Sequence, residues 1–410
     1  MSGARVTGDS GAPRDSRLGG TQGVADRLAA LTGTEAADWH VVFKARYGML
    51  ETFAAIAEHT SRRSVVSQLL TCATAVDPIL VAGLRPTYAE VSPDSLSIDP
   101  DRLAVGDDVA AVVIQHTFGI VDDAASQRVA AAARAAGALV LEDSAHCVGR
   151  MARGVDGAPI ADVAFHSFGV EKMLPTMFGG AVWVNPAMEH EALRLAIVGR
   201  LTSLDRPGWR LRCAARTYRY QLAVLNRVPR QIGRPLRSLL VKVGSFDPPV
   251  ADSETEGRLA YRSAAATGWI HAGVAAALGR LRASEELRAN AVAAYVEEFG
   301  DRVEIPASAT MGQPLVRFPF LVPPGVDPEV VIAGLRATGV VEGRWYRPAL
   351  FPGASDPAVY GYVPGAAAHA VTEGVIARIV NLPTSVEPDQ ARRTARHALE
   401  LIDSSRVGRT

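Results

Sequence analysis

The feature that most limits the fold of this chain is an alternation of apolar strands and helices between about residues 40 and 190. Helices are predicted at 49–60 and at 122–137, where an alanine-rich segment stops at Gly137. Segments rich in valine and isoleucine predict strands at 85–91, 109–115, 138–143, 162–168 and 179–185. Strands that are apolar along nearly their whole length are buried on both faces. The region therefore predicts an α/β fold, a mainly parallel sheet flanked by helices.

The rest of the chain differs in character. Because 410 residues exceed one ordinary core, we expect a disordered leader over 1–25, a large domain over 26–255 and a smaller C-terminal α+β domain over 256–410. Within the large domain, residues 190–255 predict a basic helical excursion, either a solvated surface or a cationic surface near an anionic substrate or a partner subunit. In the C-terminal part we expect helices at 264–300, 327–339 and 387–405 and strands at 316–323 and 378–385.

The totals exclude several kinds of protein. Lysine plus arginine and aspartate plus glutamate both number 43, so the net charge of zero gives no reason to expect nucleic acid or an anionic membrane as the main partner. Three cysteines form neither a metal-ligand spacing nor a disulfide framework, which fits a reducing cytoplasm and no metal site. The N-terminus lacks the apolar segment of a secretory signal, and no apolar run is long enough to span a membrane.

Lysine is rare in this chain and occurs only at Lys44, Lys172 and Lys242. Unlike arginine, lysine can lose its proton and act as a nucleophile, so Lys172 is a candidate for covalent chemistry. Asp143 ends an apolar strand 29 residues earlier, and Ser167 lies five residues before the lysine. Pyridoxal 5′-phosphate (PLP) needs a lysine that binds it covalently, an acid for its pyridine nitrogen, and hydroxyl and N–H groups for its phosphate. These three residues meet those needs.

Several segments resemble the DegT/StrS family of PLP-dependent aminotransferases, which have the fold-type-I architecture. The segments are "VLEDSAHCVG" at 140–149, "FHSFGVEKMLPTMFGG" at 165–180, "GLRPTYAEVSPDSLSIDPDRL" at 83–103, "VIQHTFG" at 113–119, "WYRPALF" at 345–351 and "VNLPTSVEPDQ" at 380–390. The resemblance implies that Lys172 binds the cofactor covalently, Asp143 pairs with the ring nitrogen and Ser167 contacts the phosphate. His146 falls beside the ring.

Two segments depart from the family pattern. "RYGML" at 46–50 takes the place of the family's "SGTAAL", and there N–H groups around Tyr47 and Gly48 are expected to face the phosphate. Cys72 falls where the family places an aromatic ring against the cofactor, so this chain resembles a divergent member. Arg344 is a weak candidate for an anionic substrate group, and we expect His116 to be structural.

The resemblance implies a homodimer with shared active sites and an amino-acid donor, glutamate or glutamine. It also implies a small-molecule acceptor, the keto group of a nucleotide-linked sugar or cyclitol. Two alternatives stay open. The chain could catalyse another PLP reaction, such as dehydration, elimination or β-replacement, because the fold does not fix the chemistry. It could also be a non-catalytic scaffold.

Overall fold

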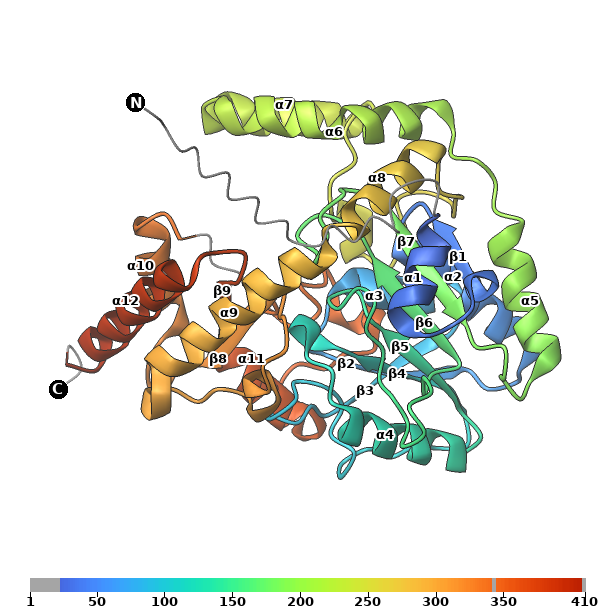
Figure 1. Cartoon of the computed structure of the whole chain (residues 1–410), viewed down its shortest axis with the longest axis horizontal. Coiled ribbons are helices and arrows are strands. Elements are labelled where there is room, and N and C mark those ends of the chain that lie inside the picture. The colour runs from blue at the N-terminus through green and yellow to red at the C-terminus, as the bar shows by residue number, and fades with distance from the viewer. Residues whose placement is uncertain (1–22, 341–343, 408–410) are drawn as a thin grey trace, which may run out of the picture.

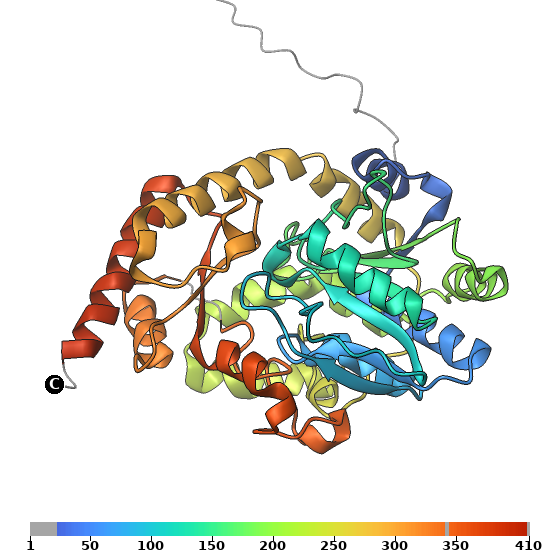
Figure 2. The ribbon, with the colours of Figure 1, turned by 90° about the horizontal axis from the view of Figure 1, so that it is seen from below.

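A seven-stranded sheet forms the centre of the computed structural model, which describes residues 23–340 and 344–407 (Figures 1 and 2). Its strands lie in the order β1-β7-β6-β5-β4-β2-β3. Their bounds are β1 Trp39–Val42, β2 Ser64–Gln68, β3 Arg85–Ala89, β4 Val109–Gln115, β5 Leu139–Asp143, β6 Val163–Ser167 and β7 Gly180–Val184. Strands β2 to β6 are parallel, whereas β7 is antiparallel to both β1 and β6. The mainly parallel sheet predicted from the sequence is confirmed.

Helices cover both faces of the sheet because its side chains alternate in direction and are apolar on both sides. On β6, Val163 and Phe165 belong to the core shared with the first group of helices, and Ala164 to the core shared with the second. The first group is α2 Ala45–His59, α3 Ala73–Val81 and α5 Glu191–Thr202. On the other face lie α1 Val24–Thr32, α4 Asp123–Ala135 and α8 Gly268–Leu278.

The C-terminal part is built on a two-stranded antiparallel sheet. Strand β8 is Arg317–Leu321 and strand β9 is Ile379–Pro383. The helices of this part are α9 Leu281–Phe299, α10 Pro328–Ala337, α11 Ala370–Arg378 and α12 Pro388–Val407. The ring of Phe318 stacks on Tyr295 and Phe299 of α9, with centroids 5.0 and 6.0 Å apart. This aromatic stack joins the small sheet to the helix that leads back to the large sheet.

Two helices, α6 Trp209–Arg227 and α7 Arg230–Lys242, form a hairpin at the top of the molecule in Figure 1. They occupy most of the basic excursion expected at 190–255.

Some local predictions need correction. The single helix expected at 264–300 is two helices, because Gly279 favours a helix end and Arg280 leaves helical geometry at φ −112°. Helix α2 begins at Ala45, four residues before the predicted start. The expected leader at 1–25 lies, as far as residue 22, outside the described residues. No helix in the described ranges has the length and apolar content needed to cross a membrane.

Candidate active site

A cavity of about 190 Å³ opens at the edge of the sheet where β5 and β6 end. Asp143 is the last residue of β5 and Ser167 the last of β6, and these strands are parallel neighbours. Both residues line the cavity, as does Lys172 on the segment that follows β6. The structure therefore brings together Asp143, Ser167 and Lys172, the three residues that were grouped from the sequence. They meet at the carboxyl ends of parallel strands, where ligands bind in such sheets.

Lys172 lies on the loop between β6 and β7. The loop is closed at its base because the N–H of Phe168 donates to the carbonyl of Gly179 at 3.0 Å. The Nζ of Lys172 lies 5.5 Å from the centre of the Trp345 ring and forms no hydrogen bond or ion pair with another described residue. Burial lowers the pKa of Lys172, and Asp143 opposes this shift. A lower pKa increases the fraction of neutral, nucleophilic amine.

Asp143 is held by its own backbone turn. Its Oδ1 accepts a hydrogen bond from the N–H of Ala145 at 3.0 Å. Burial raises the pKa of Asp143, while the Ala145 N–H and the positive charge of Lys172 lower it. A cation placed in the cavity would therefore favour the ionised carboxylate.

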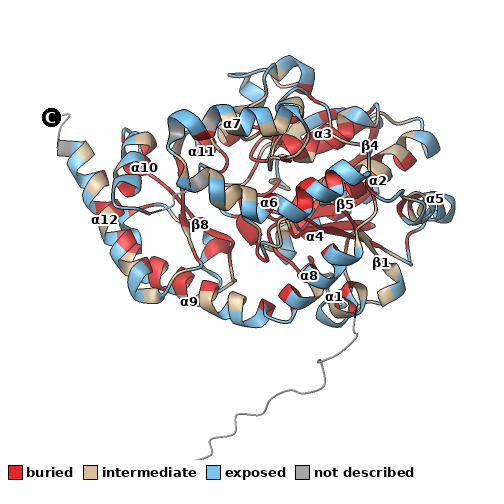
Figure 3. Cartoon of the chain, turned by 90° about the horizontal axis from the view of Figure 1, so that it is seen from above, coloured by how far each residue is buried: buried red, intermediate tan, exposed pale blue. Residues whose placement is uncertain are grey.

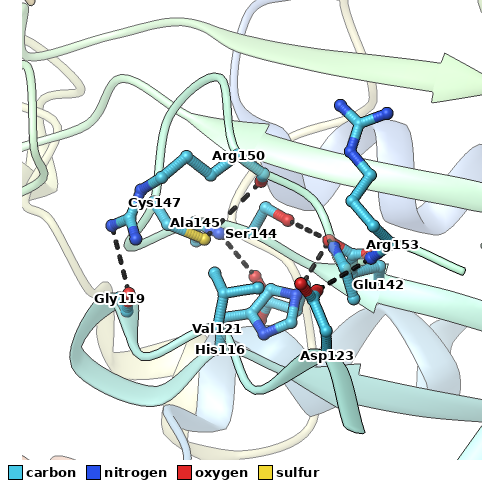
Figure 4. Close-up of polar contacts among 12 residues, drawn as sticks. His116, Gly119, Val121, Asp123, Glu142, Ser144, Ala145, Cys147, Arg150 and Arg153 are labelled. Atoms are coloured by element: carbon cyan, nitrogen blue, oxygen red, sulfur yellow. Dashed lines mark hydrogen bonds and ion pairs between the residues drawn. The ribbon is translucent and has the colours of Figure 1, made fainter. Parts of the chain in front are cut away.

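A buried network fixes the peptide next to Asp143 (Figure 4). Oε1 of Glu142 lies 2.8 Å from Nε2 of His116 and accepts hydrogen bonds from the Ser144 hydroxyl at 2.9 Å and the Ala152 N–H at 3.1 Å. His116 also lines the cavity. The His116 side chain bonds to Glu142, which agrees with the structural role expected for it.

The N-terminus of α2 also lines the cavity together with Gly179, and it packs directly on Gly180. A Cβ on Gly180 would lie 2.5 Å from the Cα of Ala45, so only glycine lets β7 approach the helix this closely. A Cβ on Gly179 would lie 3.1 Å from a methyl group of Val274, and its φ of +120° also favours glycine. The N–H groups of the first residues of a helix have no partner within the helix, and Ala45 and Arg46, the first two residues of α2, line the cavity.

The positions of Tyr47 and Gly48 differ from the expectation. Neither residue lines the cavity: the ring of Tyr47 stacks on Phe43, with centroids 6.3 Å apart, and Gly48 packs against Val182. The register is shifted because the helix begins at Ala45, so its first residues point toward the site and Tyr47 turns into the core.

Two buried ion pairs lie at this end of α2. Nζ of Lys44 is 2.7 Å from Oδ2 of Asp247, and Arg46 pairs with Glu254. Arg46 also donates to the carbonyl of Pro249 at 2.9 Å. Burial lowers the pKa of Lys44, and Asp247 opposes the shift. The cavity therefore holds two lysines, of which only Lys172 has no carboxylate partner within ion-pair distance among the described residues.

An aromatic wall reaches the cavity from the C-terminal part of the chain. The ring of His146 stacks on Trp345 with centroids 4.9 Å apart and planes 10° apart, and its Nε2 lies 3.2 Å from the hydroxyl of Tyr346. Nδ1 of His146 accepts a hydrogen bond from the Phe118 N–H at 3.1 Å, which leaves the proton on Nε2. Burial lowers the pKa of His146 well below its ordinary value, so the ring is neutral near pH 7.

Cys72, the residue before α3, lines the cavity. This agrees with its expected position beside the cofactor. Its neighbours form a short backbone pairing with the C-terminal part: the N–H of Phe351 donates to Thr71 at 2.8 Å, and the N–H of Ala73 donates to Phe351 at 2.9 Å. Phe351 and Trp345 thus supply aromatic surface to a cavity in which position 72 has none.

Several lining residues were not identified from the sequence. They are Lys44, Arg46, Tyr218, Asp247, Trp345, Tyr346 and Phe351. The rarity of lysine was a signal for Lys44 as well as for Lys172. Arg344, considered for an anionic substrate group, lies outside the cavity and pairs with Glu329 at 2.6 Å.

A mainly parallel sheet with a lysine, a carboxylate and a hydroxyl at its carboxyl edge has the architecture of the fold-type-I enzymes. Solved structures support this fold. The structure titled for DesI with its TDP-sugar product has a TM-score of 0.65 at 21% identity and covers 94% of this chain and 85% of that one. Helicobacter pylori PseC, an aminotransferase involved in the biosynthesis of pseudoaminic acid, has a TM-score of 0.67 at 14% identity and covers 95% of both chains.

Residues 48–221 match the model of the DegT/DnrJ/EryC1/StrS aminotransferase family. Over these residues the match confirms the resemblance found from the sequence motifs. A dTDP-4-dehydro-2,3,6-trideoxy-D-glucose 4-aminotransferase of Saccharopolyspora spinosa is 30% identical over 138 residues, which is 33% of this chain and 35% of the relative. The similarity therefore spans about a third of that relative's length.

Proposed function

We propose that this protein is a PLP-dependent aminotransferase that moves an amino group from an amino acid to a keto group of a nucleotide-linked sugar, a cyclitol or a related intermediate. The observation that carries the proposal is the convergence of Lys172, Asp143 and Ser167 on one cavity at the carboxyl ends of β5 and β6.

The residues present suit PLP. The amine of Lys172 has no ion-pair partner among the described residues, and Asp143 borders the cavity with one carboxylate oxygen bonded to Ala145. Ser167 and the first residues of α2 line the same cavity, so the Ser167 hydroxyl, the free N–H groups of a helix start and the positive end of its dipole would suit a phosphate. When bound, PLP supplies an electron sink for the carbon that carries the amino group.

Lys172 is the residue assigned to proton transfer. Burial lowers the pKa of Lys172, which favours the neutral amine that can accept a proton and return it to a neighbouring atom. Lys44 is not assigned this role, because Asp247 at 2.7 Å favours its protonated form. Asp143 would hold a proton on the ring nitrogen of PLP. The attraction between this carboxylate and the protonated nitrogen would be stronger in the buried site than in water.

The substrate classes rest on similarity. The family match and a relative named as a dTDP-4-dehydro-2,3,6-trideoxy-D-glucose 4-aminotransferase support a nucleotide-linked keto sugar as acceptor. Glutamate or glutamine as donor rests on the resemblance to the family alone. A homodimer with shared sites is part of the same proposal, since dimers are typical of the family.

The test combines absorbance spectra with borohydride trapping. Purified protein with PLP should show a visible absorbance band that glutamate or another amino donor bleaches, whereas a dehydratase or lyase would keep the band. Borohydride reduction and peptide mapping should place the cofactor on Lys172, and Lys172→Ala should remove the label while Lys242→Ala, a change at an exposed lysine, retains it. A label on Lys44 would overturn the assignment, and the absence of a visible band would favour the non-catalytic scaffold.

A further inference from the structure

The helical hairpin of α6 and α7 concentrates positive charge in an otherwise neutral chain. Residues 206–246 contain nine arginines, one lysine and no aspartate or glutamate, although the whole chain has a net charge of zero. The net charge of the whole chain therefore conceals a strongly cationic helical hairpin. Both helices lie at the surface with exposed residues along them (Figure 3).

Helix α7 also carries an apolar stripe that does not face the core. Ile232, Leu239 and Val243 are 60%, 57% and 56% exposed. With the half-buried Leu236, they follow one another at spacings of four, three and four residues, which places them on one face of the helix. The exposed Lys242 lies outside this stripe on the same helix. Large aliphatic side chains gathered in this way mark an interaction surface.

Helix α6 has the same two properties. Leu211, Ala214 and Tyr218 are buried on one face, while Trp209 and Tyr220 on the opposite face are 65% and 76% exposed. Trp and Tyr combine an apolar ring with a polar atom and are enriched where hydrocarbon meets water. The exposed faces of both helices therefore combine apolar or aromatic side chains with cations.

From these observations we infer that the α6–α7 hairpin binds the surface of a membrane that contains anionic lipids. The stripe of Ile232, Leu236, Leu239 and Val243 would enter the boundary between headgroups and acyl chains, and the exposed arginines of α6 would contact lipid phosphates. The element lies on the membrane and does not cross it.

The chemistry of the hairpin favours this occupant over two others. Nucleic acid would satisfy the arginines and leave the aliphatic stripe in water, because phosphates offer it no apolar surface. A second copy that paired hairpin with hairpin would bring ten positive charges against ten, with no carboxylate from 206 to 246 to compensate. An anionic lipid surface satisfies both the charge and the stripe.

A flotation assay with vesicles tests the inference. The full chain is mixed either with vesicles of phosphatidylcholine alone or with vesicles in which about one-third of the lipid is phosphatidylglycerol. We expect flotation with the anionic vesicles and much less with the neutral ones, and weaker binding in high salt because surface charges are then screened. The variant I232D/L239D should reduce the partition coefficient at least tenfold.

Control variants separate the hairpin from general surface effects. Val155→Asp and Val330→Asp alter residues that are 98% and 48% exposed elsewhere, and Arg282→Gln removes an arginine whose side chain is 94% exposed on α9. These three should float like the wild type. Equal flotation of I232D/L239D and the wild type, or no flotation with anionic vesicles, would overturn the inference. A change of oligomer mass in I232D/L239D without any vesicle binding would overturn it too, and would assign the stripe to a contact between copies.

Discussion

Replacing Gly180 by alanine should disturb both the fold and the cavity, because β7 and the start of α2 touch at this point. The added Cβ would lie 2.5 Å from the Cα of Ala45 and 2.9 Å from the carbonyl carbon of Lys44, and closer still to the nitrogen of Ala45. Ordinary contacts begin near 3.4 Å, so about 1 Å of movement is needed. These neighbours are backbone atoms and cannot relax by a change of rotamer.

The strand cannot yield easily either. Gly180 is paired with Val42 of β1 and with Ser167 of β6, so a shift of β7 would disrupt two ladders. Overpacking of this kind costs about 1–3 kcal/mol, and we expect the upper part of that range. If the helix moves instead, the N–H groups at the start of α2 retreat from the proposed phosphate position, and PLP affinity should fall about tenfold, or about 1.4 kcal/mol.

Urea unfolding followed by circular dichroism, together with titration of the protein with PLP, measures both effects. Gly199→Ala is the matched control, because Gly199 lies within α5 with open space around its Cβ position and should gain about 0.5–1 kcal/mol. A Gly180→Ala protein within about 0.5 kcal/mol of the wild type would refute the packing argument. Lost stability with unchanged PLP affinity would refute the role of the α2 N-terminus.

Three further predictions concern single side chains. Asp143→Asn should slow the half-reaction with the amino donor by about 100-fold in rapid-mixing absorbance while weakening PLP binding less, and a wild-type rate would contradict its role. Cys72→Trp should slow the loss of PLP on dialysis about three- to tenfold through ring stacking, and unchanged retention would show that residue 72 does not face the cofactor. Burial raises the pKa of Asp77 to about 8, so the folded protein retains a proton that the unfolded chain releases above about pH 4. The free energy of unfolding of the wild type should therefore fall as the pH rises from about 4 to about 8, by at most about 1.4 kcal/mol per pH unit. The urea midpoints at pH 5 and pH 9 should differ less in Asp77→Asn than in the wild type, and an equal difference would contradict this account.

The part of the site that the sequence predicted comes from local order along the chain. Asp143, Ser167 and Lys172 each follow a recognisable apolar strand, and parallel strands bring their carboxyl ends to one edge, so spacing alone places them together. The aromatic wall could not be predicted in this way. Trp345 reaches the cavity through contacts between residues about 200 positions apart, and these leave no periodic pattern in the sequence.

The part of the cavity formed by α2 was not predicted, because the predicted start of this helix lies four residues too late. The helix is predicted to begin at residue 49, whereas the chain becomes helical at Ala45. Propensity rules locate the interior of a helix better than its first turn, and the first turn is the part that meets the cavity. The pairing of Lys44 with Asp247 joins two segments that the sequence offered no reason to connect.

The backbone pairing of Phe351 with Thr71 and Ala73 sets the order in which the protein can be completed during its synthesis. Some 280 residues separate the two sides of this contact, which corresponds to roughly 15–60 s of translation. During that interval all strands of the large sheet have left the ribosome, and Lys172 is already on its loop. The wall formed by Trp345 and Phe351 is still missing, so a nascent chain stalled before residue 345 would present the lysine in a cavity open on one side. The closed site is among the last features of the molecule to form.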